Sequence, residues 1–184
     1  PDSVCRLRVG ELVSVSGRVF TGRDRLHKHL FDGNAAPVDL KYAGLFHCGP
    51  VIVRAGDAWV VKAAGPTTSI RAEPYLPAIV RKQGLGIVIG KGGMGAGTAR
   101  ACVECGCVYL HTIGGAAQVL ADRIARVVGV NFLAEFGAAE AMWELELDGF
   151  PALVTMDAHG RNLHDAVART SQAELDRLLG GASA

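Results

Sequence analysis

Two segments of the chain combine glycine, small hydroxyl side chains and a single cation. Residues 90–98 are rich in glycine and contain Lys91, while residues 65–71 contain two threonines, a serine and Arg71. Backbone N–H groups at a glycine-rich helix start attract negative charge. An arginine can hold a carboxylate through two parallel hydrogen bonds. Both segments therefore indicate a site for a small anion, such as a carboxylate or a phosphate.

The glycine-rich segment also matches the spacing G-x-G-x-x-G over residues 90–95. A dinucleotide-binding fold would place an acidic residue about 20 residues later, at the end of the next strand. The next expected strand instead runs into His111 and Thr112. Lys91 is also not followed by the Ser or Thr of a Walker loop. Two interpretations remain: an anion-binding loop that includes Gly92 and Gly93, or a structural turn with a solvated lysine.

Two further segments have both a functional and a structural interpretation. Thr67, Thr68 and Arg71 could line an anion, or they could cap a helix beside a surface arginine. Residues 22–29 carry charges of both signs and two histidines. A helix here would place Asp24 and His27 one turn apart on one face, which suits either a site or a solvated helix surface.

Three of the five cysteines crowd into a C-x-x-C-x-C pattern formed by Cys102, Cys105 and Cys107. Iron–sulfur or zinc binding is one interpretation of this spacing. The first two cysteines fall on an expected helix and the third enters a strand, and a fourth ligand is not evident, although His111 is near. Structural cysteines are the simpler interpretation, and we predict no metal site in this chain.

Composition limits the classes of function. The chain has 184 residues, 49% of them hydrophobic, with 19 Lys and Arg against 18 Asp and Glu. A near-neutral balance argues against a nucleic-acid partner, and no apolar run is long enough to span a membrane. An odd number of cysteines is typical of reduced thiols. We expect one domain over residues 1–184 and a cytoplasmic location, with neither nucleic acid nor membrane as a partner.

Hydrophobic periodicity and turn residues predict the elements. Expected strands are 12–20, 45–48, 51–53, 59–64, 86–90, 108–110 and 130–133, together with an antiparallel pair, 142–147 and 152–156, that turns at residues 149–151. Expected helices are 24–31, 74–83, 98–105 with Thr98 as its cap, 116–128 and 171–179. A β-rich first half thus leads into alternating strands and helices. The pattern predicts an α/β fold with helices flanking a mixed sheet.

Five segments, taken in order along the chain, resemble one enzyme family. They are residues 7–17, 21–27, 65–69, 90–95 and 139–152, and they span most of the sequence. The chain is similar to the β subunit, or C-terminal domain, of the class I iron–sulfur hydro-lyases, a family that includes class I fumarate hydratase and L(+)-tartrate dehydratase.

This resemblance implies a swivelling β/β/α domain that closes over a partner. The partner would be an α subunit or an N-terminal domain that binds a [4Fe-4S] cluster with its own cysteines, in a higher oligomer of αβ units. The implied reaction is the reversible removal of water from a small 2-hydroxy dicarboxylate. The expected activity is hydration of fumarate to (S)-malate. Conversion of tartrate to oxaloacetate and a non-catalytic anion-binding module are the alternatives.

The same resemblance implies roles for individual residues. Arg23, Arg71 and Lys91 are expected to hold substrate carboxylates, and Thr67 and Thr68 to line the substrate. Thr67 is the candidate for proton transfer, with Asp24 and His27 as supporting residues. The glycine loop would add Gly92 and Gly93 to the substrate-binding set.

Overall fold

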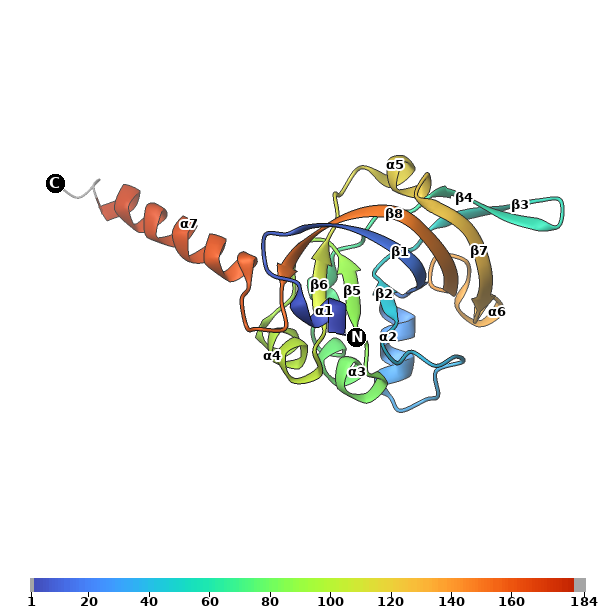
Figure 1. Ribbon diagram of the computed structural model, residues 1–184, viewed down its shortest axis with the longest axis horizontal. Coiled ribbons are helices and arrows are strands. Elements are labelled where there is room, and N and C mark those ends of the chain that lie inside the picture. Colours follow the sequence, from blue (N-terminus) through green and yellow to red (C-terminus); the bar gives the residue numbers. More distant parts are fainter. Residues whose placement is uncertain (1, 181–184) are drawn as a thin grey trace.

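The computed structural model describes residues 2–180 and confirms the predicted α/β fold with a mixed sheet and flanking helices (Figure 1). Four parallel strands form its centre: β1 (Leu12–Thr21), β2 (Gly44–Phe46), β5 (Ile87–Gly90) and β6 (Val108–His111). The long strand β8 (Met142–Met156) runs antiparallel to both β6 and β1. The sheet order is β1-β2-β5-β6-β8-β7, and the extra β1–β8 pairing closes it on itself.

Three helices cover one side of the parallel strands: α2 (Asp24–Phe31), α3 (Leu76–Gln83) and α4 (Ala96–Cys105) (Figure 1). Each contributes an apolar face to a shared core, represented by Leu26, Ile79 and Cys102, which are fully buried. Gly84 ends α3, and Gly106 ends α4, in the left-handed conformation that glycine adopts without strain. The three helices lie on the connections between successive parallel strands and return the chain to the edge where each of these strands begins.

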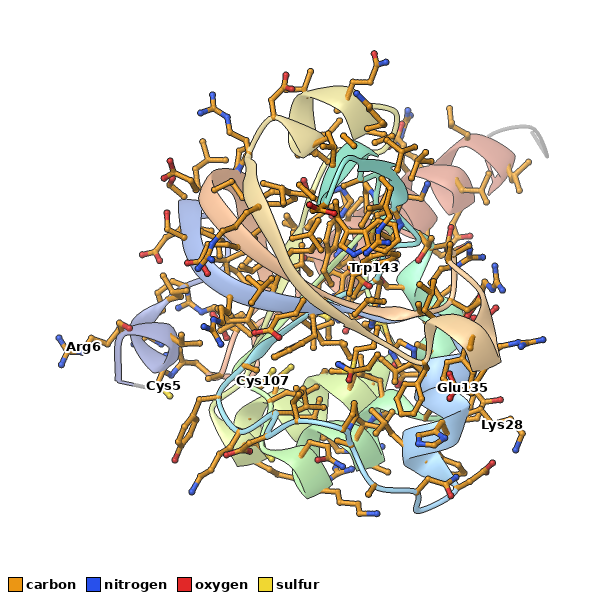
Figure 2. The ribbon with its side chains drawn as sticks, turned by 90° about the vertical axis from the view of Figure 1, so that its right-hand side faces the viewer. Cys5, Arg6, Lys28, Cys107, Glu135 and Trp143 are labelled. Atoms are coloured by element: carbon orange, nitrogen blue, oxygen red, sulfur yellow. The ribbon has the colours of Figure 1, made fainter. Side chains whose placement is uncertain are left out.

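A second core lies on the other side, where β8 and β7 (Ile124–Asn131) bend over the parallel strands. Phe46 and Phe150 meet edge to face, with ring centroids 5.4 Å apart. The hairpin of β3 (Val51–Ala55) and β4 (Ala58–Ala63) extends from this layer. Trp59 of the hairpin packs on the buried Trp143 of β8, which is labelled in Figure 2. The two cores give a β/β/α layering.

Short elements complete the described chain: α1 (Asp2–Arg6), the 3-10 turn η1 (Ser69–Ala72), α5 (Ala117–Ala121) and α6 (Leu133–Phe136). The last helix, α7 (Leu163–Gly180), extends away from the other layers and buries none of its residues (Figure 1). It begins eight residues earlier than the predicted helix 171–179. Within residues 2–180, no helix combines the length and the hydropathy needed to cross a bilayer.

The predicted turn at residues 149–151 is wrong, because β8 continues through it as one strand. Val15 pairs with Phe150 and Gly17 with Leu147, so two residues of β8 face one residue of β1 in a bulge. Gly149 has a φ of +64° and takes up the bend. Pairing with β1 over almost its whole length keeps β8 extended, and this long-range contact overrides the local turn signal of Gly149 and Pro151.

The bulge makes Gly149 sensitive to substitution. We expect Gly149→Ala to lower the free energy of unfolding by about 1–2 kcal/mol, because an L-residue resists the left-handed backbone. Gly129→Ala is the matched control, since this strand glycine has no positive φ and its added Cβ would only make an ordinary contact with Glu144 at 3.6 Å. Urea denaturation of both variants measures the difference. Equal stabilities would show that the bulge tolerates a side chain.

The predicted helix 116–128 is also wrong beyond its first turn. The helix α5 ends at Ala121, and residues 124–131 form β7. The expected strand 130–133 is therefore the end of β7 followed by α6. Ile124, Val127 and Val128 are β-branched residues that favour a strand, and β7 pairs along the outer edge of β8. The apolar spacing of residues 116–128 fits a helix, and it contains no information about the free edge of β8 with which this segment pairs.

Candidate functional site

The predicted site residues gather at one edge of the sheet, where the four parallel strands end. Arg23 and Asp24 follow β1, and Lys91 follows β5. The expected strand 45–48 ends at Phe46, so that His47 also lies just beyond a strand. The carboxyl ends of parallel strands are the usual place for a ligand in such folds. The topology thus brings together the segments that the sequence pointed to separately.

The threonine segment crosses this edge between β2 and β5. The backbone N–H of Thr67 donates to the carbonyl of His47 at 2.7 Å, and the Thr67 hydroxyl donates to the same oxygen at 3.1 Å. Thr68 forms a parallel bridge with Lys91, and the N–H of Ser69 donates to the Lys91 carbonyl at 3.0 Å. These bonds fix the segment against both strand ends. The Thr67 oxygen keeps its lone pairs for other partners.

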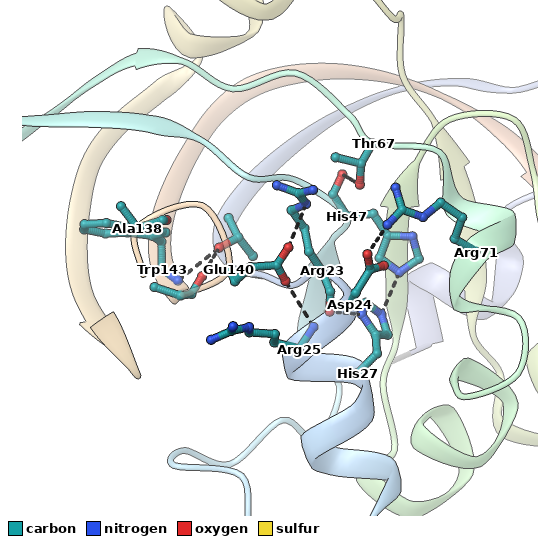
Figure 3. A network of polar contacts seen from close by, with 12 residues as sticks. Arg23, Asp24, Arg25, His27, His47, Thr67, Arg71, Ala138, Glu140 and Trp143 are labelled. Carbon is teal, nitrogen blue, oxygen red and sulfur yellow. Dashed lines mark hydrogen bonds and ion pairs between the residues drawn. The ribbon is translucent and has the colours of Figure 1, made fainter. Parts of the chain in front are cut away.

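Arg23 precedes α2 and is held from two sides. Its Nε lies 3.4 Å from a carboxylate oxygen of Glu140, and the other oxygen of Glu140 accepts from the N–H of Arg25 at 3.0 Å (Figure 3). A Cβ on Gly49 would lie 2.8 Å from Arg23 Cδ and Nη1. Glu140 therefore anchors the start of α2 and orients Arg23, while Gly49 leaves room for the guanidinium.

Arg71 forms an ion pair with Asp24, which brings η1 to the start of α2 (Figure 3). The side chains are 58% and 51% exposed. Ion pairs this exposed contribute little net stability, because water screens both charges. Arg71 is thus held near the strand ends by an acidic neighbour and still faces solvent, where it can contact a second carboxylate.

Lys91 is the third cation of the group. Its side chain lies along Gly114, where a Cβ would be 3.3 Å from Lys91 Cδ and 3.6 Å from Nζ. In the part of the chain that the structure describes, Lys91 has no acidic partner, whereas Arg23 and Arg71 each have one. The charge of Lys91 is therefore available to an anion.

The glycine loop differs from expectation in one respect. Thr98 is not the cap of α4, because Gly95 occupies that position without a side-chain cap. The carboxylate of Glu73 instead accepts from the N–H of Gly95 at 2.8 Å, from the N–H of Thr98 at 3.1 Å and from the Thr98 hydroxyl at 2.7 Å. A protein carboxylate thus already binds the first turn of α4. The predicted helix-start site for an external anion is occupied from within the chain.

Glu73 should consequently matter for stability. We expect Glu73→Gln to lower the free energy of unfolding by about 1–2 kcal/mol, because it replaces a charged acceptor of three hydrogen bonds at a helix start. Glu104→Gln is the matched control, since Glu104 only forms an exposed ion pair with Arg81. Urea denaturation should leave the control close to the unchanged protein, because water screens this exposed ion pair. A Glu73→Gln variant no less stable than the control would contradict this role.

Gly92 and Gly93 both have positive φ, at 79° and 76°. A Cβ on Gly93 would collide with the ring of His164, so the loop lies flat against that histidine. Gly92 is exposed beside the hollow that His111 and His164 line. The loop therefore needs glycine for its conformation and its close approach, and its place in substrate binding stays a prediction.

His27 lies at the site edge but does not reach solvent, since only 2% of it is exposed. Its ring contacts His47, another buried histidine, with the two Nε2 atoms 3.1 Å apart. Burial lowers the pKa of His27 and lowers that of His47 well below its ordinary value, so both favour the neutral form. His47, Ser69 and Tyr109 form a polar core that sequence reasoning missed. Only the position of His47 after a short strand could have signalled it.

The cysteines do not fit an iron–sulfur or zinc site. Cys102 and Cys107 are buried and Cys105 is half-buried. A hydrogen bond with Cys102 and burial raise the pKa of the Cys107 thiol well above its usual range, although a metal ligand must be the thiolate. Over residues 2–180, no three His, Cys, Asp or Glu side chains are grouped to hold a metal ion. These thiols belong to the packed core around α4.

Known proteins with similar sequences show the family of this chain. Residues 1–167 match the protein family described as Fumarase C-terminus. The chain belongs to that family. It is 50% identical over 178 residues to a "Putative fumarate hydratase class I" of Geobacillus stearothermophilus, a match that covers 96% of this chain and 34% of that protein. The chain thus spans about a third of the length of that relative.

Other relatives of this Fumarase C-terminus chain have a similar length. It is 35% identical over 182 residues to a "Putative L(+)-tartrate dehydratase subunit beta" of Methanocaldococcus jannaschii, covering 96% of this chain and 93% of the relative. It is 33% identical over 159 residues to the "L(+)-tartrate dehydratase subunit beta" of Escherichia coli K12, covering 85% and 79%. The predicted family resemblance is confirmed.

Proposed function

We propose that this chain is the β part of a hydro-lyase that reversibly hydrates fumarate to (S)-malate. The observation that carries the proposal is the convergence of Arg23, Arg71 and Lys91 with two threonines at one edge of the sheet. A C4 dicarboxylate has a negative charge at each end. Two separate groups of cations can hold both ends, and so fix the carbon atoms between them.

The cations also have a role in the reaction. A proton on the carbon next to a carboxylate is weakly acidic, and its removal places negative charge on that carboxylate. Arg71 and Lys91 would stabilise this charge as it develops, because they are positioned before the reaction begins. Arg23, which Glu140 orients, would hold the opposite carboxylate.

Thr67 is the residue that we assign to proton transfer. Its hydroxyl hydrogen points to the His47 carbonyl, so the oxygen lone pairs are the part left for substrate. A threonine hydroxyl is a weak base, and an activated nucleophile or base needs help from its surroundings. Lys91 and Arg71 supply positive charge that favours an alkoxide, whose own proton would leave to bulk water before the site closes. The alkoxide would then take the carbon-bound proton of the substrate and become a hydroxyl again. Exclusion of water by a second protein part would strengthen that effect.

The second part is the partner that we propose for this chain. Two relatives are named as β subunits, and the longer relative contains about twice as much chain outside the match as within it. A partner subunit or an N-terminal domain would carry the [4Fe-4S] cluster of this enzyme class. The core cysteines of the present chain do not fit that cluster, so its ligands would come from the partner. The complete site would form where the two parts close.

Tartrate is the second candidate substrate. Relatives that match this chain over most of their own length are named as tartrate dehydratase subunits. Tartrate has the same two carboxylates and one more hydroxyl, so the same cations would hold it. The choice between the two substrates then depends on polar groups that contact the extra hydroxyl, including groups of the partner.

The test is turnover by the assembled protein. This chain is co-expressed with its cluster-bearing partner under anaerobic conditions, and malate and L(+)-tartrate are supplied side by side. Fumarate absorbance follows the first reaction, and a coupled oxaloacetate assay follows the second. Formation of fumarate supports the proposal, whereas turnover of tartrate alone moves it to the second substrate. A stable complex that converts neither acid would contradict it and favour a non-catalytic anion-binding module.

A further inference from the structure

A continuous chain of polar groups runs through the core beneath the site. It begins at the Tyr109 hydroxyl, which lies close to Gly90 at the start of the glycine loop. The Tyr109 hydroxyl donates to Ser69 Oγ at 2.8 Å, and Ser69 Oγ lies 2.8 Å from His47 Nδ1. The series of hydrogen-bonded groups continues through His27 and ends at the carbonyl of Arg23, the residue before α2.

The second half of this series of polar groups contains two histidines in contact with each other. His47 Nε2 lies 3.1 Å from His27 Nε2, and His27 Nδ1 lies 2.6 Å from the Arg23 carbonyl oxygen. Figure 3 shows His47 below Thr67 and His27 below His47, and the two rings meet edge to face. Both rings, Ser69 and Tyr109 are at most 2% exposed. Water therefore does not interrupt the chain at these groups.

The Arg23 carbonyl, at one end of this series of hydrogen-bonded groups, determines the direction of every hydrogen bond in it. A carbonyl only accepts, so His27 Nδ1 must carry a hydrogen, and the Nε2 of a neutral His27 must accept. His47 then donates from Nε2 and accepts at Nδ1, which takes the hydrogen of Ser69. The remaining lone pairs of Ser69 accept from Tyr109. All bonds thus point from Tyr109 towards Arg23, and bonds aligned in this way polarise one another.

We infer that this series of hydrogen-bonded groups from Tyr109 through Ser69, His47 and His27 to Arg23, here called the core relay, positions the two sides of the site relative to each other and holds only while both histidines are neutral. Its ends are the Tyr109 hydroxyl, close to Gly90 next to Lys91, and the Arg23 backbone next to Asp24. Ser69 in its middle adjoins Thr68. The histidines, Ser69 and Tyr109 are positioning residues that act through these neighbours. Their effect on catalysis rests on the proposed function.

Packing supports a dedicated device rather than incidental contact. A Cβ on Gly90 would collide with Ser69 Oγ and would lie 2.9 Å from the Tyr109 hydroxyl and 3.3 Å from His47 Nδ1. Glycine is therefore required where β5 passes the relay. A second proton on His47 would go to Nδ1 and oppose the hydrogen that Ser69 Oγ donates there, and a second proton on His27 would go to Nε2 and place two N–H groups against each other across 3.1 Å. The relay would break at that point.

Burial and the nearby carboxylates shift the pKa of His27 in opposite directions. Asp24 and Glu140 raise the pKa of His27, while burial lowers it and has the larger effect. The nearness of His27 adds to burial in lowering the pKa of His47. Asp24 is itself paired with Arg71, and Glu140 with Arg23. The neighbouring Cys48 thiol and the Tyr109 hydroxyl stay neutral, because burial raises the pKa of each.

The test is 15N NMR of histidine-labelled chain in its assembled complex at pH 7. The relay predicts that His27 is the neutral Nδ1–H tautomer and His47 the neutral Nε2–H tautomer, with assignments from His27→Asn and His47→Asn. Tyr109→Phe removes one hydroxyl at the far end, and should change the His47 and His27 nitrogen shifts through the relay. Tyr75→Phe is the matched control, because the Tyr75 ring packs on Phe31 and should leave those shifts unchanged.

Activity gives a second readout. Tyr109→Phe should lower kcat/KM for the dicarboxylate about 10- to 100-fold, as small misplacements of reacting groups do, whereas Tyr75→Phe should not. A protonated histidine at pH 7, the opposite tautomers, or shifts that ignore Tyr109→Phe would overturn the relay. These NMR results do not depend on turnover. An inactive complex with the predicted tautomers would therefore contradict the proposed function and leave the relay supported.

Discussion

Replacement of Arg71 by alanine should lower kcat/KM for the dicarboxylate by about 30- to 1,000-fold, equivalent to about 2–4 kcal/mol. The physical reason is that one substrate carboxylate would enter the closed site without its guanidinium partner. Asp24 would also lose its ion-pair partner and add a negative charge beside that carboxylate. Steady-state kinetics of the assembled enzyme, with malate or tartrate as substrate, measure the change.

Two variants make this result specific. Arg71→Lys keeps the charge but loses the planar fork, and should recover only part of the activity. Arg177→Ala is the matched control, because Arg177 also forms an exposed ion pair, with Glu174 on α7, far from the strand ends. Its kinetics should equal those of the unchanged enzyme. If Arg71→Ala also left kcat/KM unchanged, Arg71 would have no place in the substrate site.

Replacement of Thr67 by alanine should reduce kcat by about 10²- to 10⁴-fold, the usual contribution of a positioned acid or base. KM should change much less, because the cations that hold the carboxylates remain. This separation distinguishes proton transfer from binding. Isotope exchange of the substrate carbon-bound hydrogen with solvent offers a direct measurement, since the variant should lose exchange together with turnover.

Thr67→Ser is the conservative control and should retain most of kcat, because it keeps the hydroxyl that donates to the His47 carbonyl. Thr170→Ala provides a distant threonine whose hydroxyl donates to a helix carbonyl in α7. Both controls test whether a loss comes from this hydroxyl alone. A Thr67→Ala enzyme with normal kcat and a raised KM would show that Thr67 binds substrate and does not transfer a proton.

A pH experiment tests the buried histidines at the level of stability. Because burial lowers the pKa of His27 and His47, the unfolded chain takes up protons near pH 6.5 while the folded chain resists. The free energy of unfolding should be highest above that pH and should fall as the pH decreases below it. Urea denaturation between pH 5 and 8 would show the slope, and His27→Asn should reduce it. An unchanged slope in the variant would mean that other groups cause the loss.

The sequence contained the signals that are local. Helix α2 has the predicted bounds of residues 24–31, because a polar start and apolar residues at helical spacing lie within one short segment. The motifs that ended up at the strand ends could be identified for the same reason. The motifs after β1 and β5 join a parallel strand to a turn, and parallel strands bring such turns to one edge. The threonine segment instead follows β4 of the separate hairpin and is held at that edge by its bonds to His47 and Lys91.

What the sequence could not supply depends on contacts between distant segments. Glu73 reaches the first turn of α4 from more than 20 residues away, and no helix-start rule includes such a donor–acceptor pair. The relay joins Tyr109 to Ser69 across 40 residues. Likewise, residues 124–131 form the strand β7 because they hydrogen-bond to the free edge of β8. In each of these cases tertiary structure decided between local alternatives.

The most direct test of the site is the structure of the assembled enzyme with a bound substrate or analogue. We expect one carboxylate within hydrogen-bond distance of Arg71 and Lys91 and the other near Arg23. The Thr67 hydroxyl oxygen should face the carbon that loses its proton. An analogue bound by the partner alone, with no contact to these four residues, would contradict the account.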